Sequence, residues 1–141
     1  MLTPGEDGIF SLGDEWNYLL RLIDFELRVS ERYKRYLSLT MIVAGNGPVS
    51  ISKTLEDALR ISDELVDLEG STTLLMPETD VEGAMTAVGR FKRKCNGTID
   101  LRFAVVSFPR DGKSTGALVD KAVQRLEKAK AGAKGEVVAS G

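Results

Sequence analysis

The sequence contains no histidine and only one cysteine, Cys95. Histidine is the commonest general base and transition-metal ligand of proteins, so its absence excludes histidine-based triads and most zinc chemistry. A single cysteine forms no internal disulfide and gives no metal-site spacing, which suits a reducing compartment. We therefore expect a cytoplasmic protein.

Long apolar runs and a strong net charge are also missing. No apolar run approaches the roughly 20 residues that span a bilayer, and the N-terminal "MLTPGEDGIF" lacks the basic-then-apolar order of a signal peptide. The 19 basic and 21 acidic residues give a net charge of -2, too small to attract nucleic acid or an anionic membrane. We expect neither as a partner.

The composition is that of a soluble globular protein, with 43% hydrophobic and 28% charged residues. A chain of 141 residues has the size of one domain. We expect a flexible N-terminal segment, residues 1–12, followed by a single domain, residues 13–139.

The first half of the chain alternates helical and strand patterns. Apolar spacing predicts a helix over residues 11–36, capped by Ser11, and the apolar run "LSLTMIVA" predicts a central strand over 37–44. A second helix is predicted over 52–63, and "LVDL" and "TTLLM" flank Glu69-Gly70 as a hairpin.

The second half completes a mixed architecture. Thr79 and Glu82 form a capping box before a third helix with Met85 on its inner face, and Asn96-Gly97 ends that helix. A strand over 99–108, an amphipathic helix over 113–132 and a short strand at "EVVA" follow. This order predicts the α/β (α+β) class, with a mixed sheet of about five strands flanked by four helices.

Several segments resemble the GGDEF family of diguanylate cyclases. They are "FELRVSERYKRYLSLTMI", "LMPETDVEGA" and, most specifically, "FPRDGKSTGALVDKAVQRLEKAK", and the likeness covers nearly the whole chain from Phe25 onward. The resemblance implies a sheet of the nucleotide-cyclase or polymerase-palm type and a bacterial signalling role. Active members of the family join two GTP molecules into cyclic di-GMP with metal ions held by carboxylates.

The resemblance also implies that the metal-binding carboxylates are missing here. The family has Asp-x-Asp-x-Phe-Lys at the end of its first strand, with the first aspartate as a metal ligand, whereas residues 43–48 read "VAGNGP". At the signature hairpin, residues 69–73 read "EGSTT", so that Ser71 or, in the other register, Gly70 takes the place of the catalytic acid. The guanine-binding loop shrinks to "GNGPVSISKTLED". We expect a degenerate domain with no catalytic residues, metal or cofactor.

The motif Arg60-Ile61-Ser62-Asp63 matches the Arg-x-x-Asp inhibitory site of the family. The resemblance implies that Arg60 and Asp63 bind cyclic di-GMP, joined by Arg90 from the next helix. A guanidinium fork fits a phosphate and the O6/N7 edge of guanine, and a carboxylate fits the opposite edge. The alternative is a solvated pair, because Arg21-Leu22-Ile23-Asp24 has the same pattern.

These observations favour a catalytically inactive GGDEF-like signalling module that acts through protein–protein interaction. A protein partner or an upstream regulatory domain is expected, while homodimer formation and membership of a larger regulator stay open. Trp16, Tyr18 and Phe25 on the first helix serve either core packing or docking. A different class, a GTP-binding allosteric domain or residual nucleotidyl-transfer enzyme using Glu69 and Lys130, also stays open.

Overall fold

The structure is a computed structural model that describes residues 9–45, 50–95 and 97–141. Its helices are α1 (Ile9–Tyr33), α2 (Ile51–Leu55), α3 (Val81–Cys95) and α4 (Thr115–Ala131), with a short 3-10 helix η1 (Glu56–Ala58) after α2. Its strands are β1 (Leu37–Ala44), β2 (Glu64–Leu68), β3 (Ser71–Pro77), β4 (Leu101–Phe108) and β5 (Val137–Val138). The predicted order of helices and strands is therefore confirmed.

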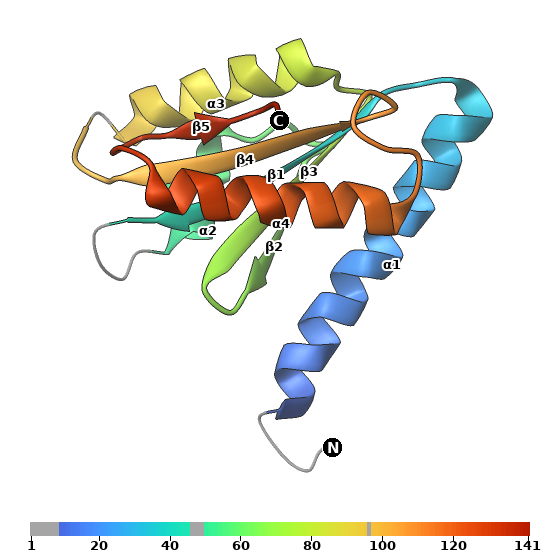
Figure 1. Cartoon of the computed structure of the whole chain (residues 1–141), viewed down its shortest axis with the longest axis horizontal. Coiled ribbons are helices and arrows are strands. Elements are labelled where there is room, and N and C mark those ends of the chain that lie inside the picture. Colours follow the sequence, from blue (N-terminus) through green and yellow to red (C-terminus); the bar gives the residue numbers. More distant parts are fainter. Residues whose placement is uncertain (1–8, 46–49, 96) are drawn as a thin grey trace.

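The strands form one sheet in the order β2-β3-β1-β4-β5, with β1 at its centre (Figure 1). β1 runs antiparallel to both β3 and β4, so Leu37 lies opposite Pro77 on one side and Phe108 on the other. The start of β1 and the ends of β3 and β4 thus meet at one end of the sheet. The hairpin turn at Glu69-Gly70 and the end of β1 lie toward the other end.

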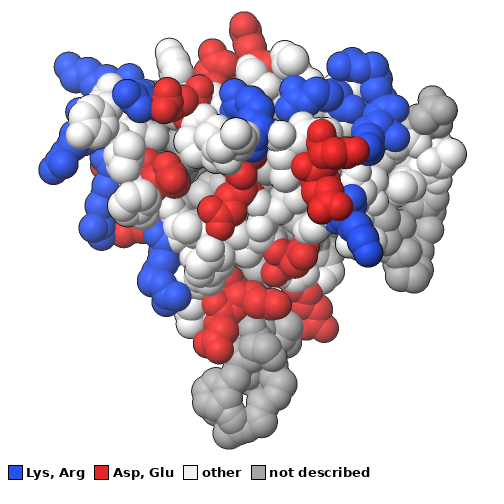
Figure 2. Space-filling view, turned by 180° about the vertical axis from the view of Figure 1, so that it is seen from behind, with Lys and Arg blue, Asp and Glu red and all other residues white. Residues whose placement is uncertain are grey.

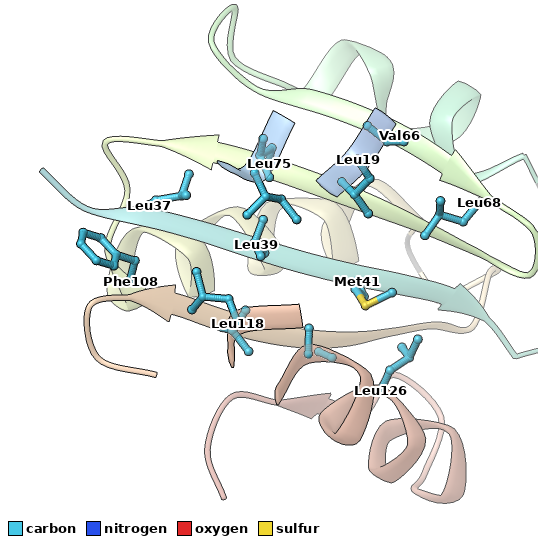
Figure 3. Packing of buried hydrophobic residues seen from close by; sticks show 14 of the residues in the cluster. Leu19, Leu37, Leu39, Met41, Val66, Leu68, Leu75, Phe108, Leu118 and Leu126 are labelled. Atoms are coloured by element: carbon cyan, nitrogen blue, oxygen red, sulfur yellow. The ribbon is translucent and has the colours of Figure 1, made fainter. Parts of the chain in front are cut away.

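Helices cover both faces of this sheet, which explains why β1 is buried along almost its whole length and mostly apolar. Leu39 and Met41 belong to the core cluster beneath α1 and α4, part of which Figure 3 shows. Ile42 points to the opposite face and packs with α2 and α3. Burial on both faces makes β1 a rigid centre from which the loops at each end of the sheet project.

The helix predicted over residues 52–63 is wrong in its second half. α2 ends at Leu55, η1 ends at Ala58, and Leu59 has an extended backbone. The carboxylate of Asp63 accepts a hydrogen bond from the backbone N–H of Arg60 at 3.0 Å, which competes with helical hydrogen bonding. Residues 60–63 therefore form a turn before β2, named here the 60–63 turn.

Two details of the helix ends and one of a helix face also differ from prediction. α1 begins at Ile9, so Ser11 lies inside the helix rather than at its cap. Asp80, not Thr79, caps α3, because its Oδ1 accepts from the N–H of Gly83 at 2.9 Å. Met85 is exposed, since it lies about 100° around the helix from buried Ala84.

The predicted flexible segment, residues 1–12, is described only in part. Residues 1–8 lie outside the described residues, as does Asn96, whereas residues 9–12 belong to α1. Among the helices that the structure describes, none is both long and apolar enough to cross a membrane. The cytoplasmic location stays a prediction.

Candidate ligand-binding sites

The 60–63 turn brings Arg60 and Asp63 into contact, as the motif predicts. The N–H of Asp63 donates to the carbonyl oxygen of Arg60 at 3.0 Å, and the Arg60 Nη2 lies 3.4 Å from Asp63 Oδ1. Both carboxylate oxygens of Asp63 therefore serve the turn itself. The side chain of Asp63 is 0% exposed, whereas that of Arg60 is 51% exposed.

Arg60 is also held by the segment that follows β3. Its Nη2 donates to the hydroxyl of Thr79, which in turn donates to the carbonyl oxygen of Pro77 at 2.9 Å. Nε and Nη1 of Arg60 have no hydrogen-bond partner among the described residues. The turn thus presents a fixed, half-exposed guanidinium with unused donors, the arrangement that suits a phosphate or the O6/N7 edge of a guanine.

Arg90 lies on α3 beside the segment that leads into this turn. Its Nε donates to the carbonyl oxygen of Ala58 at 3.1 Å, and its guanidinium carbon is 5.5 Å from the centre of the Phe91 ring. Arg90 is therefore anchored to Ala58, which lies two residues before Arg60 in the chain. No hydrogen bond or ion pair joins Arg90 to Arg60 or Asp63 among the described contacts.

Ser71 and Gly70, the two residues that the resemblance aligns with the catalytic acid, lie at the hairpin between β2 and β3. Ser71 begins β3 opposite Leu68, and Gly70 occupies the left-handed region with φ +86°. Glu69 is exposed at the tip and pairs with no described residue. The hydroxyl of Ser71 cannot replace a carboxylate as a ligand for a hard divalent cation without further acidic neighbours.

Val43 and Gly45, at the end of β1, stand where the resemblance places the two aspartates of the family pattern. Val43 is 5% exposed and packs in the cluster under α1 and α4. A Cβ atom added to Gly45 would lie 2.3 Å from Oδ2 of Asp100 and 3.0 Å from Nε of Arg102. Where the family pattern places two aspartates, this chain has a core valine and a glycine without room for a side chain.

Asp100 and Arg102 form the ion pair that occupies this space. Nη2 of Arg102 lies 2.9 Å from Oδ2 of Asp100, and hydrogen bonds from Arg102 hold the pKa of Asp100 below its usual value despite the opposing effect of burial. Nη1 of Arg102 donates to the carbonyl oxygens of Lys130 and Gly132 at 2.7 and 2.9 Å. The pair therefore fastens the end of α4 to the sheet.

A pocket of about 340 Å³ lies between the hairpin and the end of α4, and its lining includes Gly45, Gly70, Arg102 and Lys130 but no carboxylate. The ammonium group of Lys130 pairs with Glu127 at 3.1 Å. Within the described residues, no three His, Cys, Asp or Glu side chains come together as a metal-binding group. The side chains of this pocket do not fit the divalent metal ions that the cyclase reaction uses.

Sequence reasoning missed a buried ion pair on α4. Nη2 of Arg125 lies 2.9 Å from Oδ1 of Asp111, and its Nη1 donates to the carbonyl oxygen of Val105 at 2.7 Å. Burial alone would raise the pKa of Asp111, but hydrogen bonds from Arg125, Arg110 and the N–H of Ser107 lower it to about 2. The available signal was the position of Arg125, three residues after Ala122 on the buried face.

A chain of polar contacts joins these regions along the end of the sheet. The hydroxyl of Ser38 donates to the carbonyl oxygen of Thr79 at 2.7 Å and lies 2.7 Å from the hydroxyl of Ser107. The N–H of Ser107 then donates to Asp111 at 2.9 Å. The 60–63 turn and the loop after β4 are thus linked through buried hydrogen bonds.

Comparison with known proteins supports the fold through structure rather than sequence. No family model matches the chain, and no curated protein matches it. The GGDEF domain of YfiN (TpbB) from Pseudomonas aeruginosa aligns with a TM-score of 0.81 at 15% identity, over 89% of this chain and 94% of that one.

Two further solved structures have the same fold. The active GGEEF domain of a diguanylate cyclase from Vibrio cholerae gives a TM-score of 0.76 at 14% identity, covering 87% of this chain and 94% of that one. The diguanylate cyclase SiaD of Pseudomonas aeruginosa, solved with its activator SiaC, gives 0.77 at 19% identity, covering 88% of this chain and 57% of that one. The chain has the fold of a GGDEF domain, and the predicted palm-type fold is confirmed.

Proposed function

We propose that this chain is a non-catalytic signalling module with the GGDEF fold, which acts by binding another protein and responds to cyclic di-GMP. The observation that carries the first part is the burial of Val43 in the core, at the position where the resemblance places the metal-binding aspartate, next to the crowding at Gly45. Phosphoryl transfer between nucleotides needs carboxylates to hold the metal ions that neutralise the triphosphate. A carboxylate at position 45 would collide with Asp100, and one at position 43 would place a charge in the core.

Turnover of GTP tests this part directly. The chain should form no cyclic di-GMP from GTP and Mg²⁺ under conditions in which an active diguanylate cyclase does. A titration with GTP separates the alternative, in which Glu69 and Lys130 serve a GTP-binding allosteric domain. Tight binding of GTP that depends on Mg²⁺ contradicts our assignment, because it requires metal ligands that the pocket lining lacks.

The outer side of α1 supports a protein-binding role. Trp16 packs against the core, whereas Tyr18, Phe25 and Tyr33 are 44%, 62% and 58% exposed. The hydroxyl of Tyr18 donates to Glu64 of β2 at 2.8 Å, and the ring of Tyr33 lies 5.4 Å from the guanidinium carbon of Arg35. The spacing of seven and eight residues between these aromatic residues places their rings along one side of the helix. Exposed aromatic rings in a row are typical of contact surfaces. A photo-crosslinking amino acid at Phe25 should capture a partner chain, and the same amino acid at Gln124, exposed on α4, should not.

Binding of cyclic di-GMP is proposed at the 60–63 turn. The fixed guanidinium of Arg60, with unused donors, supports recognition of a phosphate and a guanine edge. Arg90, anchored at Ala58, adds a second guanidinium beside the same segment. Asp63 takes part only if the turn releases its carboxylate, which the turn already uses.

Calorimetric titration of cyclic di-GMP tests this site. Micromolar binding to the wild type should be lost in Arg60→Ala and weakened in Arg90→Ala. Arg21→Ala is the matched control, because Arg21 stands in the other Arg-x-x-Asp pattern on exposed α1. If the wild type shows no heat of binding at high ligand concentration, Arg60 and Asp63 are a structural pair and the protein-binding role stands alone.

A further inference from the structure

A second surface lies at the end of the sheet where α1 passes into β1. Here a groove of about 430 Å³ runs between the end of α1 and the loop after β4. Buried Ser30 and Phe108 line the groove together with the exposed side chains of Tyr36 and Pro109. We call this the α1–β4 groove. Basic side chains gather at the corresponding edge, at the left of Figure 2, with acidic ones between them.

The rim of the α1–β4 groove is basic. Lys34, Arg35 and Lys113 line it against a single acidic residue, Glu31. Arg35 pairs with Glu78 at 2.8 Å, but neither Lys34 nor Lys113 has a hydrogen bond or ion pair with any described residue. Two ammonium groups without an ion pair to a described residue therefore stand beside an apolar floor, and basic residues outnumber Glu31 in the lining, which favours an acidic ligand.

Lys34 has an unfavourable backbone conformation for a residue other than glycine. It follows the last residue of α1 with φ +54°, and the N–H of Arg35 closes the helix by donating to the carbonyl oxygen of Ser30 at 2.8 Å. Glycine adopts this left-handed conformation more easily than lysine. Ser30, which is 4% exposed as a residue, also lines the groove and carries a hydroxyl group. The groove thus offers a polar group as well as charges.

The shape of this end of the sheet favours an extended occupant. A second depression of about 280 Å³ shares Tyr36, Phe108 and Pro109 with the α1–β4 groove, so the two form one track. Two acidic residues, Asp80 and Glu82, and one basic residue, Arg110, line the far part of this track, so the excess of basic residues is confined to the α1–β4 groove. A track that crosses an exposed tyrosine and proline between charged ends matches a peptide strand better than a single small molecule.

From this groove, rim and track we infer that the α1–β4 groove binds an extended acidic peptide of a partner protein. Its acidic residues lie on Lys34 and Lys113, and an apolar residue packs against Tyr36, Phe108 and Pro109. The inference rests on the proposed protein-binding function and names the chemistry of one partner. None of the residues that line the groove belongs to the 60–63 turn, whereas Arg35 on its rim lies 5.4 Å from the ring of Tyr33, the last aromatic residue of the row on α1.

Selection from a phage-displayed library of random dodecapeptides tests the inference. Peptides enriched on the wild-type chain should combine Asp or Glu with an apolar residue. In fluorescence anisotropy they should bind Lys34→Glu/Lys113→Glu at least about tenfold more weakly. The matched control is Lys53→Glu/Lys128→Glu, which makes the same charge change at two exposed lysines outside the groove. Tyr36→Ala should weaken the same peptides.

Three results would overturn the inference. They are a failure to enrich any peptide above background, enriched peptides without acidic residues, and an equal loss of binding in the two double variants. A decathymidine oligonucleotide that binds through the same lysines more tightly than the best peptide would assign the groove to nucleic acid instead. None of these results touches the GTP and cyclic di-GMP titrations, because Lys34 and Lys113 lie at neither of those sites.

Discussion

Alanine at position 45 should destabilise the fold mainly through one contact, between its methyl group and the carboxylate of Asp100. The added carbon would lie 2.3 Å from Oδ2 and 2.9 Å from Cγ of Asp100. That carboxylate also accepts from Arg102 and from the N–H of Gly135 at 2.8 Å, so it cannot withdraw without losing hydrogen bonds. Gly45 does not have a left-handed backbone, so alanine adds no conformational strain there.

The magnitude follows from these two effects. Overpacking costs about 1–3 kcal/mol, and a lost hydrogen bond to a charged group costs about 1.5–3 kcal/mol. We expect Gly45→Ala to lower the free energy of unfolding by about 3 kcal/mol. In an Asp100→Ala background the two shortest contacts are removed and only the flexible side chain of Arg102, whose Nε lies 3.0 Å from the added carbon, has to shift, so the same change should cost less than about 1 kcal/mol.

Urea unfolding of the wild type, the two single variants and the double variant measures this coupling. We expect a coupling energy of about 2 kcal/mol between the two positions. Gly116→Ala is the control, because no atom lies within 4 Å of its added Cβ and it stands in helix α4, where alanine is favoured. If the costs of the two single changes add to within about 0.5 kcal/mol, the crowding argument against a carboxylate at position 45 is refuted.

Three other predictions follow from the same structure. The pKa of Asp111 in the folded chain is about 2, against an ordinary 3.8. The ionised carboxylate therefore stabilises the folded state above about pH 4, and this stabilisation is lost as the pH falls toward 2. In acid unfolding, Asp111→Asn should lack that loss of stability. Phe25→Ala, at an exposed ring, should change the free energy of unfolding by less than about 0.5 kcal/mol, whereas Ile23→Ala, at a buried position, should cost about 2–5 kcal/mol in the same urea assay. Burial raises the pKa of the Cys95 thiol, so its reaction with a thiol reagent should be slow until the chain unfolds.

Local patterns predicted most of the fold. The run 37–44 is apolar because both faces of β1 are covered, and this signal needs no knowledge of the rest of the chain. The hairpin at Glu69-Gly70 is equally local, since a glycine with φ +86° suits a tight turn. Elements of this kind can be predicted from a few neighbouring residues alone.

The errors arose where a side chain competed with the backbone. Leu55 and Leu59 have helical spacing, but Asp63 captures the N–H of Arg60 and ends the helical path. Thr79 reads as a helix cap, yet its hydroxyl serves Arg60 and Pro77 and leaves the capping to Asp80. Periodicity cannot reveal which of two nearby polar residues takes such a role.

The partners of Arg102 and Arg125 could not be predicted because they are set by tertiary structure. The carbonyl groups that Arg102 binds lie 28 and 30 residues further along the chain. Arg125 is buried against Val105 and Asp111, although a charged residue in a helix is normally exposed. Each arginine joins the sheet to α4 or to the residues after it, and these contacts exist only once the whole chain has folded.

Arg60 and Asp63 were predicted as one functional pair, but the structure gives them unequal parts. The Asp63 side chain, 0% exposed, satisfies an N–H and a guanidinium within the 60–63 turn, so removing it leaves donors unpaired and disturbs the turn. Nε and Nη1 of Arg60 make no hydrogen bond to a described residue, and outside the turn Arg60 contacts Thr79, after β3. A variant at Arg60 therefore reports on ligand binding, whereas a variant at Asp63 reports on the turn as well. A ligand that recruits both residues must first compensate for the hydrogen bonds that Asp63 gives up, which makes binding and the conformation of this turn energetically coupled.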